Sequence, residues 1–250
     1  MSNKLLEVVN LSKIYHDRDG ETKALEDVNF SVYENEFISI IGPSGCGKST
    51  ILSILSKVDS KSNGEIKYKN NNFKVGYMLQ KDCLFDWLTV LDNCLIGLKI
   101  RKELTKERKN KVIELLNTYG LKDFKDKYPN SLSGGMRQRV ALIRTLAIDP
   151  DILFLDEPFS ALDYQTRLSL SDELYQIIKN EHKTVIMVTH DIAEAISMSD
   201  RIIVLTKRPG TIKNIYNIEL KKKDLPTKNR TDEYFLKYYD LLWKELDHNV

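Results

Sequence analysis

The feature that most constrains this chain is a short glycine-rich stretch, Gly42-Pro43-Ser44-Gly45-Cys46-Gly47-Lys48-Ser49-Thr50. An apolar run at residues 37–41 comes directly before it, and a second apolar run at residues 51–55 comes directly after it. The spacing G-x-x-x-x-G-K-S between a buried strand and a helix is typical of a loop that binds phosphate groups. The sequence therefore predicts a strand, a phosphate-binding loop and a helix, in that order.

The residue types in this loop suit a phosphate chain. Glycines allow successive backbone N–H groups to face one anion, where a Cβ would block the approach. The helix expected to start near Lys48 adds the positive end of its dipole. We expect Lys48 to reach the β- and γ-phosphates and the Ser49 hydroxyl to hold Mg²⁺. The alternative is a glycine-rich turn without a ligand, but the flanking strand and helix argue against it.

Length, charge and hydropathy limit the classes of protein to which this chain can belong. The 250 residues suffice for one large domain or two small ones. A formal net charge of +2 gives no support to a DNA- or RNA-binding role. No run approaches the roughly 18 apolar residues of a membrane span. The first residues lead directly into a strand-like run, so we expect no signal peptide.

Three cysteines, Cys46, Cys83 and Cys94, cannot form a fully paired disulfide framework and show no C-x-x-C spacing. They are typical of a protein in the reducing cytosol, where thiols stay free. Cys46 differs from the others because it lies in the phosphate loop. Alkylation of Cys46 is therefore expected to interfere with phosphate binding.

Alternating strands and helices predict an α/β fold. Continuous apolar runs argue for a parallel sheet that is covered on both faces. These runs lie at residues 37–41, 152–156, 184–189 and 201–205. Further strands are expected at residues 5–9, 28–32, 64–68 and 74–79. Helical periodicity in residues 90–98, 105–119 and 133–148 predicts an all-helical insertion at about 82–149.

The end of the chain is expected to add a linker and a helix. Residues 221–226 have the composition of a linker, and residues 231–246 are amphipathic. The apolar residues predicted to share one face of that helix are Tyr234, Phe235, Tyr238, Leu241, Leu242 and Leu246. We expect this face to pack on the core or on a neighbouring subunit.

Two acids, Asp156 and Glu157, end one of the apolar runs. Ligands of an open parallel sheet sit beyond the carboxyl ends of the strands, where the phosphate loop also lies. We therefore expect Asp156 to bind Mg²⁺, directly or through water, and Glu157 to orient and polarise an attacking water. The alternative is an acidic loop without a catalytic role.

A second glycine motif, Leu132-Ser133-Gly134-Gly135-Met136, stands at the start of an expected helix. Ser133 is placed to cap that helix. The two glycines after it expose backbone amides at the positive helix end, which predicts a second anion site.

Together these motifs resemble those of the ATP-binding-cassette (ABC) ATPases, and the resemblance covers nearly the whole chain. The phosphate loop is similar to the family's Walker A motif, residues 152–157 to its Walker B motif, and residues 132–136 to its signature motif. The resemblance implies a P-loop NTPase (RecA-like) core with a mostly parallel sheet, a small antiparallel β part and an inserted all-helical subdomain. Residues 1–220 would form the ATPase domain, and residues 221–250 the linker and C-terminal helix.

The resemblance also implies ATP and Mg²⁺ as ligands and assigns roles to four further positions. Gln80 matches the Q-loop glutamine, which contacts Mg²⁺ and the attacking water. His190 matches the switch histidine, which contacts the γ-phosphate. Tyr15 falls where an aromatic ring stacks on adenine, and Ser160-Ala161-Leu162-Asp163 matches the D-loop.

In the family, two copies pair head to tail, and the signature motif of one covers the ATP on the phosphate loop of the other. The resemblance therefore places Ser133, Gly134, Gly135, Met136 and Asp163 among the nucleotide-binding residues. It implies as partners a second ATPase subunit, transmembrane permease subunits and, indirectly, a substrate-binding protein, with no nucleic acid. The expected location is peripheral, on the cytoplasmic side of the cell membrane.

Within the family, the chain resembles the importer ATPases for nitrate, sulfonates and taurine. Met136 stands in place of the more usual signature glutamine, and residues 207–212 read Lys-Arg-Pro-Gly-Thr-Ile. Two features depart from many of these importers. Asp86 stands where many have proline, and the loop between Gly64 and Gln80 is shorter.

Leu84, Phe85 and Trp87 lie together after Gln80, in a region that in the family receives a coupling helix from a transmembrane subunit. Exposed aromatic residues are good interface anchors. The alternative is that these residues are buried against the helical insertion.

Two other functions remain open at this point. A soluble cassette ATPase acting on nucleic acid or ribosomes would carry a coiled-coil insertion, zinc-ligand pairs, tandem cassettes or a strongly basic surface, and none is present in the sequence. A nucleotide-binding regulator that does not hydrolyse ATP is disfavoured by Gln80, Glu157 and His190.

Overall fold

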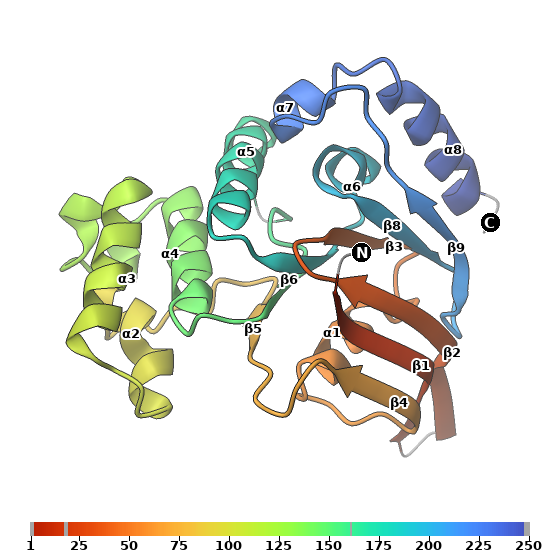
Figure 1. Ribbon diagram of the computed structural model, residues 1–250, viewed down its shortest axis with the longest axis horizontal. Coiled ribbons are helices and arrows are strands. Elements are labelled where there is room, and N and C mark those ends of the chain that lie inside the picture. Colours follow the sequence, from red (N-terminus) through yellow and green to blue (C-terminus); the bar gives the residue numbers. More distant parts are fainter. Residues whose placement is uncertain (1–2, 18–19, 161, 248–250) are drawn as a thin grey trace.

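The computed structural model describes residues 3–17, 20–160 and 162–247, which form two sheets with helices around them (Figure 1). The larger sheet has the strand order β5-β6-β7-β3-β8-β9, in which β9 alone is antiparallel to its neighbour. Its strands are Val75–Met78 (β5), Ile152–Asp156 (β6), Thr184–Val188 (β7), Phe37–Ile41 (β3), Arg201–Leu205 (β8) and Ile212–Asn217 (β9). The expected α/β fold with a mostly parallel sheet is therefore confirmed.

The central strands of this sheet are apolar because both of its faces are covered. Every residue of β3, β6 and β7 is buried, so no position alternates with solvent. Parallel strands end at the same edge of a sheet. The loops that follow β3, β6 and β7 are thereby brought together.

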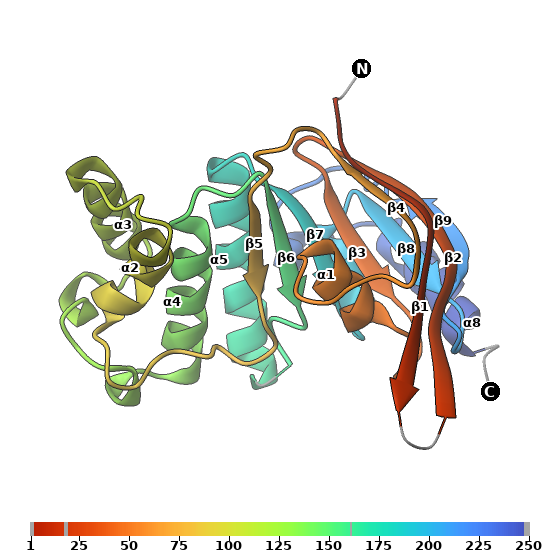
Figure 2. The ribbon, with the colours of Figure 1, turned by 90° about the horizontal axis from the view of Figure 1, so that it is seen from below.

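A smaller antiparallel sheet has the order β2-β1-β4, with β1 at Lys4–Asp17, β2 at Gly20–Tyr33 and β4 at Asn63–Tyr68. Helix α1 (Lys48–Leu55) lies between the two sheets (Figure 2), and its buried side chains share a core with both. Strands β1 and β2 are longer than expected because several register shifts let them bend and continue. Strand β1 continues to Asp17 and β2 begins at Gly20; Arg18 and Asp19 lie outside the described residues.

Between β5 and β6 the described chain is helical, and this part lies at one end of the molecule (Figure 2). Its main helices are α2 (Val90–Ile100), α3 (Lys106–Thr118) and α4 (Gly134–Leu146), with short 3₁₀ turns at Lys122–Phe124 and Pro129–Ser131. Hydroxyls of Thr89 and Thr105 cap α2 and α3. The inserted all-helical subdomain is as expected.

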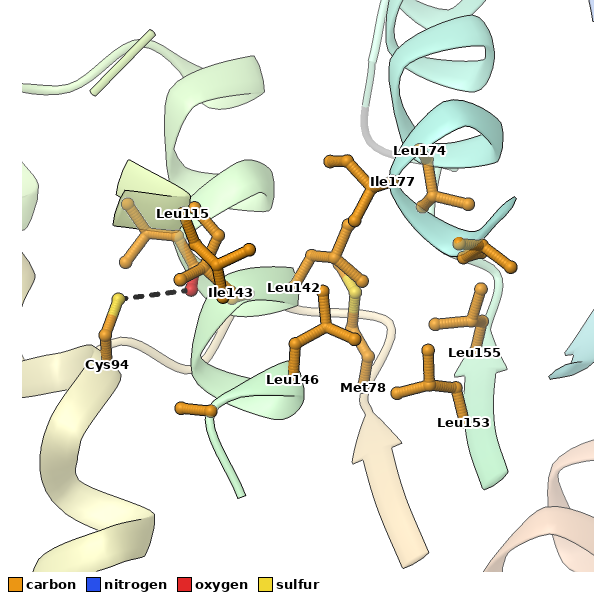
Figure 3. Packing of buried hydrophobic residues seen from close by; sticks show 14 of the residues in the cluster. Met78, Cys94, Leu115, Leu142, Ile143, Leu146, Leu153, Leu155, Leu174 and Ile177 are labelled. Atoms are coloured by element: carbon orange, nitrogen blue, oxygen red, sulfur yellow. Dashed lines mark hydrogen bonds between the residues drawn. The ribbon is translucent and has the colours of Figure 1, made fainter. Parts of the chain in front are cut away.

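Helix α4 joins this insertion to the sheet. Figure 3 shows Leu142 and Leu146 of α4 beside Met78 at the end of β5, while Ile143 points toward the helical side. A Cβ at Gly76 in β5 would lie 2.8 Å from the Thr145 methyl of α4. The helix and strand are therefore packed so closely that only glycine suits this position.

Helices α5 (Tyr164–Asn180) and α6 (Ile192–Met198) contribute buried side chains to two of the three apolar clusters. Two elements after them were not expected. Strand β9 adds an antiparallel edge, and Pro226–Asn229 forms a short helix, α7, at the end of the expected linker. Asn229 is buried and donates to the Ser197 carbonyl at 2.7 Å, so this segment is docked on α6.

The C-terminal helix α8 (Phe235–Asp247) packs on α6 and on the β8–β9 side of the sheet. Phe235 and Leu242 are buried, but Tyr234 and Leu241 are exposed. The prediction that all six apolar residues share one face is therefore wrong for these two. Tyr234 precedes the helix, and Leu241 is turned by about 100° from Leu242 around the helix axis.

Side chains of β9 converge on one carboxylate of α8. Glu245 accepts hydrogen bonds from Asn214 Nδ2 at 2.8 Å and from the Tyr216 hydroxyl at 2.6 Å. Lys213 Nζ lies 2.9 Å from its other oxygen. Helix α8 is thereby fastened along the outer edge of the sheet.

Within residues 3–17, 20–160 and 162–247, no helix has the length and apolar character needed to cross a bilayer.

Candidate nucleotide-binding site

The glycine-rich loop connects β3 to α1 at the carboxyl edge of the larger sheet. Gly45 and Gly47 have φ values of 72° and 101°, a region that side chains with a Cβ rarely adopt. A Cβ at Gly47 would also lie 2.6 Å from a Leu25 methyl. The glycines are therefore required by this backbone path, which directs the loop around the start of α1.

Lys48 is the first residue of α1, and its ammonium group bonds to the loop itself. Lys48 Nζ donates to the carbonyls of Gly42 at 2.8 Å and Pro43 at 2.9 Å. These carbonyls hold the cation over the loop opening. A phosphate chain in the loop would meet this cation and the positive N-terminus of the helix.

A second group of polar atoms lies beside the loop, at the end of β6. Ser49 Oγ donates to Asp156 Oδ1 at 2.9 Å, and the Tyr77 hydroxyl donates to Asp156 Oδ2 at 3.2 Å. Burial raises the pKa of the Asp156 carboxyl, while the hydrogen bonds from Ser49 and Tyr77 lower it. A hydroxyl and a buried carboxylate at this distance are oxygen donors of the kind that Mg²⁺ prefers. These residues are therefore suited to hold the metal next to a phosphate chain.

Glu157 receives contacts from two other strand ends. Gln80 Nε2 donates to Glu157 Oε2 at 3.0 Å, and His190 Nδ1 lies 3.4 Å from the same oxygen. The Glu157 backbone has a φ of 45°, which is unfavourable for a residue with a side chain. Its N–H donates to the Val188 carbonyl at 2.9 Å, and this bond holds the strained turn in place. Gln80, Glu157 and His190 thus lie together, as a water-activating group requires.

Tyr15 lines a pocket together with Lys48 and Glu157. Its ring is 39 % exposed, its hydroxyl donates to Asp59 at 2.9 Å, and Lys13 Nζ lies 4.7 Å from the ring centroid. The pocket, of about 290 Å³, is open to solvent. It is lined by Tyr15, Thr22, Ala24, Ser44, Gly45, Gly47, Lys48, Ser49, Thr50, Glu157 and Arg208.

Arg208 is a pocket residue to which the sequence reasoning gave no role. It belongs to the turn between β8 and β9, which lies against the phosphate loop: a Cβ at Gly210 would be 2.1 Å from the Cys46 carbonyl oxygen. Among the described residues, Arg208 has no hydrogen bond or ion pair, and its guanidinium is free to meet an anion. In the sequence, residues 207–212 indicate only a resemblance to a subgroup, because their contact with the phosphate loop is not visible there.

Cys46 itself is buried, with 1 % of its surface exposed. Burial also raises the pKa of its thiol, which disfavours the reactive thiolate. Alkylation of Cys46 is therefore hindered both by the burial of the side chain and by the raised pKa of its thiol.

The second glycine motif lies apart from this pocket. The Ser133 hydroxyl accepts from the Met136 N–H at 3.3 Å and caps α4, as expected. Asp163 caps α5 in the same way, by accepting from the Thr166 N–H at 3.0 Å. None of the residues from Ser133 to Met136, nor Asp163, lines the pocket with Lys48. Ala161, in the D-loop match, lies outside the described residues.

The loop after Gln80 is tied to α4. Arg137 donates to both carboxylate oxygens of Asp82, at 2.8 and 3.0 Å, and Arg144 donates to the carbonyls of Asp82 and Cys83, at 2.6 and 2.7 Å. A shallow cavity of about 670 Å³ lies among residues 80–84, the start of α4 and residues 160 and 162. Helix α4 is thereby fastened to the loop that begins at Gln80.

Of the three residues predicted to anchor a partner in this loop, Leu84 is buried and cannot contact one. Leu84 is only 8 % exposed and belongs to the core of the helical part, so its assignment as a surface anchor is wrong. Phe85 is half-buried, and Trp87 is 73 % exposed. Their rings lie 5.2 Å apart and form a small aromatic patch.

Comparison with known proteins gives one consistent result. Residues 25–160 match a family model described as "ABC transporter". The chain is 45 % identical to the uncharacterized ABC transporter ATP-binding protein YtlC of Bacillus subtilis (strain 168), with 97 % of this chain and 95 % of that protein covered. It is 36 % identical to the aliphatic sulfonates import ATP-binding protein SsuB of Bacillus thuringiensis subsp. konkukian (strain 97-27), over 95 % of this chain and 94 % of that protein.

A solved structure agrees with these relatives. The dimeric ATP-binding cassette MJ0796, in a post-hydrolysis state bound to ADP and Pi, matches with a TM-score of 0.73 and 33 % sequence identity. The match covers 86 % of this chain and 99 % of that one.

Proposed function

Since this chain belongs to the ABC transporter family and is one of its ATP-binding, ATP-hydrolysing proteins, we propose that it powers an importer and acts as a head-to-tail pair of identical subunits. In this proposal, each ATP lies between the phosphate loop of one copy and the Ser133–Met136 motif of the other. The membrane subunits of the importer are separate chains. We also propose that residues 1–220 form the ATPase domain and residues 221–250 an appended segment.

One observation carries the pairing proposal: the residues proposed to bind phosphate groups form two groups that do not share a pocket. The phosphate loop, Asp156 and Glu157 make one group, and the capped start of α4 makes the other. Gly134 and Gly135 leave backbone N–H groups at a positive helix end. A second copy would bring these donors to the open side of the first pocket and exclude bulk water.

The chemistry of the site follows from the contacts. Lys48 would exchange its loop carbonyls for phosphate oxygens, because a charged acceptor makes the stronger hydrogen bond. Ser49 and Asp156 would hold Mg²⁺, which when bound neutralises charge on the phosphate oxygens. Glu157 would orient the attacking water and accept its proton, with Gln80 and His190 fixing the carboxylate. Tyr15 would stack on adenine with the face opposite Lys13.

The pairing proposal is tested by the dependence of turnover on protein concentration. We expect the ATPase rate per molecule of purified protein to rise with protein concentration until pairs predominate. Phosphate release would be followed over a dilution series at saturating ATP and Mg²⁺. A rate per molecule that stayed constant down to the highest dilution would contradict pairing, whereas an absence of any ATP hydrolysis would contradict the proposed activity.

We further propose that the Phe85–Trp87 patch contacts the transmembrane subunit. Trp87 is exposed on the loop that Arg137 and Arg144 fasten to α4. A partner bound there could therefore sense movements of both Gln80 and the Ser133–Met136 motif. Exposed tryptophan rings are among the strongest anchors at protein interfaces.

The variant Phe85→Ala/Trp87→Ala is expected to lose binding to the membrane subunit and to keep the ATPase rate of the isolated protein. Binding would be measured by co-purification of the membrane subunit in detergent. Trp243→Ala serves as the matched control, because Trp243 is a second exposed tryptophan, on the distant helix α8. Unchanged recovery of the membrane subunit with the double variant would refute the assignment.

For the transported molecule we propose a small anion or zwitterion of the nitrate, sulfonate or taurine type. The support is the resemblance to importers of this group and the name of the SsuB relative. We propose a peripheral location on the cytoplasmic face of the membrane, where the permease subunits would hold the pair. Co-purification of the complete importer with its substrate-binding protein would identify the ligand directly.

A further inference from the structure

Arg167 on α5 joins two segments that the proposed mechanism treats separately. Its Nη2 donates to the carbonyl of Leu162, shortly before the start of α5, at 3.4 Å. Its Nη1 lies 3.4 Å from Asp191 Oδ2, and its Nε lies 3.7 Å from Glu194 Oε1. One guanidinium group thus spans the gap between the start of α5 and the start of α6.

The two carboxylates that face Arg167 also fix the chain on both sides of His190. The buried Glu194 accepts a hydrogen bond from the Thr189 hydroxyl at 2.6 Å. The same hydroxyl accepts from the Asp191 N–H at 3.0 Å. Asp191 in turn caps α6 by accepting from the N–H groups of Ala193 and Glu194. The residues before and after His190 are therefore held by one network.

The guanidinium is incompletely bonded. Arg167 Nε is buried without a hydrogen-bond acceptor among the described residues, and its nearest carboxylate oxygen is beyond hydrogen-bond distance. A buried donor without a partner is unfavourable, so a closer approach of Glu194 to Arg167 would stabilise the network. A shift at Leu162 that moves the guanidinium toward Glu194 would supply this bond.

We propose that Arg167 is a positioning residue that transmits the position of Leu162 to His190. The inference rests on the proposed function, because a second copy would contact Leu162 when the pair closes. The resulting shift of Arg167 would move Asp191 and Glu194 with it, and would adjust the His190 imidazole between Glu157 and the γ-phosphate. ATP binding to the open subunit does not need this step, but turnover does.

The variant Arg167→Met tests this directly, because it removes the charge and keeps most of the side-chain volume. We expect kcat to fall on the order of tenfold to a hundredfold, since a small misplacement of a catalytic group has such effects. The KM for ATP should change by less than about twofold. Glu194→Gln should lower kcat similarly, because it removes the charge that faces Arg167 and keeps an acceptor for Thr189. Arg167→Lys should restore part of the rate.

Two comparisons separate positioning from a general loss of structure. Arg201→Met removes a similarly half-buried arginine that pairs with Glu36 at 3.0 Å, at the amino end of β8, and it should leave kcat unchanged. In a His190→Ala background, Arg167→Met should cause no further loss in single-turnover rate.

The inference is overturned if Arg167→Met keeps the wild-type kcat, if Arg201→Met lowers kcat as much, or if the losses of Arg167→Met and His190→Ala multiply. Should Arg167→Met not fold, an unchanged kcat of Glu194→Gln overturns it as well. The failure of the pairing proposal looks different, because the ATPase rate per molecule of the wild-type protein would then stay constant on dilution.

Discussion

The variant Glu157→Gln is expected to bind ATP and to lose turnover, with kcat lower by a factor on the order of 10² to 10⁴. Glu157 Oε2 lies 3.0 Å from Gln80 Nε2 and 3.4 Å from His190 Nδ1, so the carboxylate is fixed where an attacking water would be activated. A neutral amide cannot accept the proton of that water. Phosphate release would measure kcat, and isothermal titration calorimetry would measure the dissociation constant of ATP.

The same variant should also accumulate as an ATP-bound dimer, detectable by light scattering after gel filtration, because closure is not followed by hydrolysis. Glu181→Gln is the matched control. Its side chain has the same exposed fraction as that of Glu157, 22 %, and pairs with Lys111 far from the loop. Wild-type turnover in Glu157→Gln would remove Glu157 from the catalytic step, and the proposed water activation would have to be assigned elsewhere.

Lys48→Ala is expected to lose most of the affinity for ATP. The ammonium group of Lys48 is buried and bonded only to uncharged acceptors of the loop, at 2.8 and 2.9 Å. In the ATP complex, Lys48 and a phosphate group would form a desolvated, charged hydrogen-bonded pair. Removing one partner of such a pair costs about 2–5 kcal/mol in binding, which raises the dissociation constant of ATP on the order of a hundredfold. Calorimetric titration with ATP and ADP in the presence of Mg²⁺ would measure the loss.

Lys223→Ala is a suitable control for this loss. Lys223 also bonds to a backbone carbonyl, that of Ser199, at 2.8 Å, but it lies away from the phosphate loop. The Lys223→Ala variant should bind ATP with the same affinity as the wild-type protein. Retention of wild-type affinity by Lys48→Ala, with the control behaving normally, would mean that backbone amides alone hold the phosphates.

The sequence was sufficient for features that depend on neighbours in the chain. The glycine-rich loop, the capping Ser133 and the acids after the apolar run at residues 152–155 each depend on consecutive residues, so their spacing predicts local structure directly. The parallel sheet was also predictable. Strands that are buried on both faces do not alternate between apolar and polar residues. Every residue of β3, β6 and β7 is buried in this way.

Features that depend on distant parts of the chain could not be predicted in the same way. Leu84 is buried in a cluster that side chains of α2 and α4 also form, which its loop position does not reveal. Arg208 reaches the pocket because Gly210 packs on the Cys46 carbonyl. Arg167 gains its contacts from α6, whose position follows from the fold of the whole sheet. Strand β9 was missed because its alternation is weak and it pairs on one side only.

Helix α8 is fastened along β9, which is an edge strand of the larger sheet. In the described sheet, β9 has a strand on one side only, and such an edge offers free N–H and C=O groups to any extended peptide. Lys213, Asn214 and Tyr216 are instead engaged with Glu245. The last helix is therefore fastened, through these side chains, to the strand at which another chain's strand would pair with the sheet.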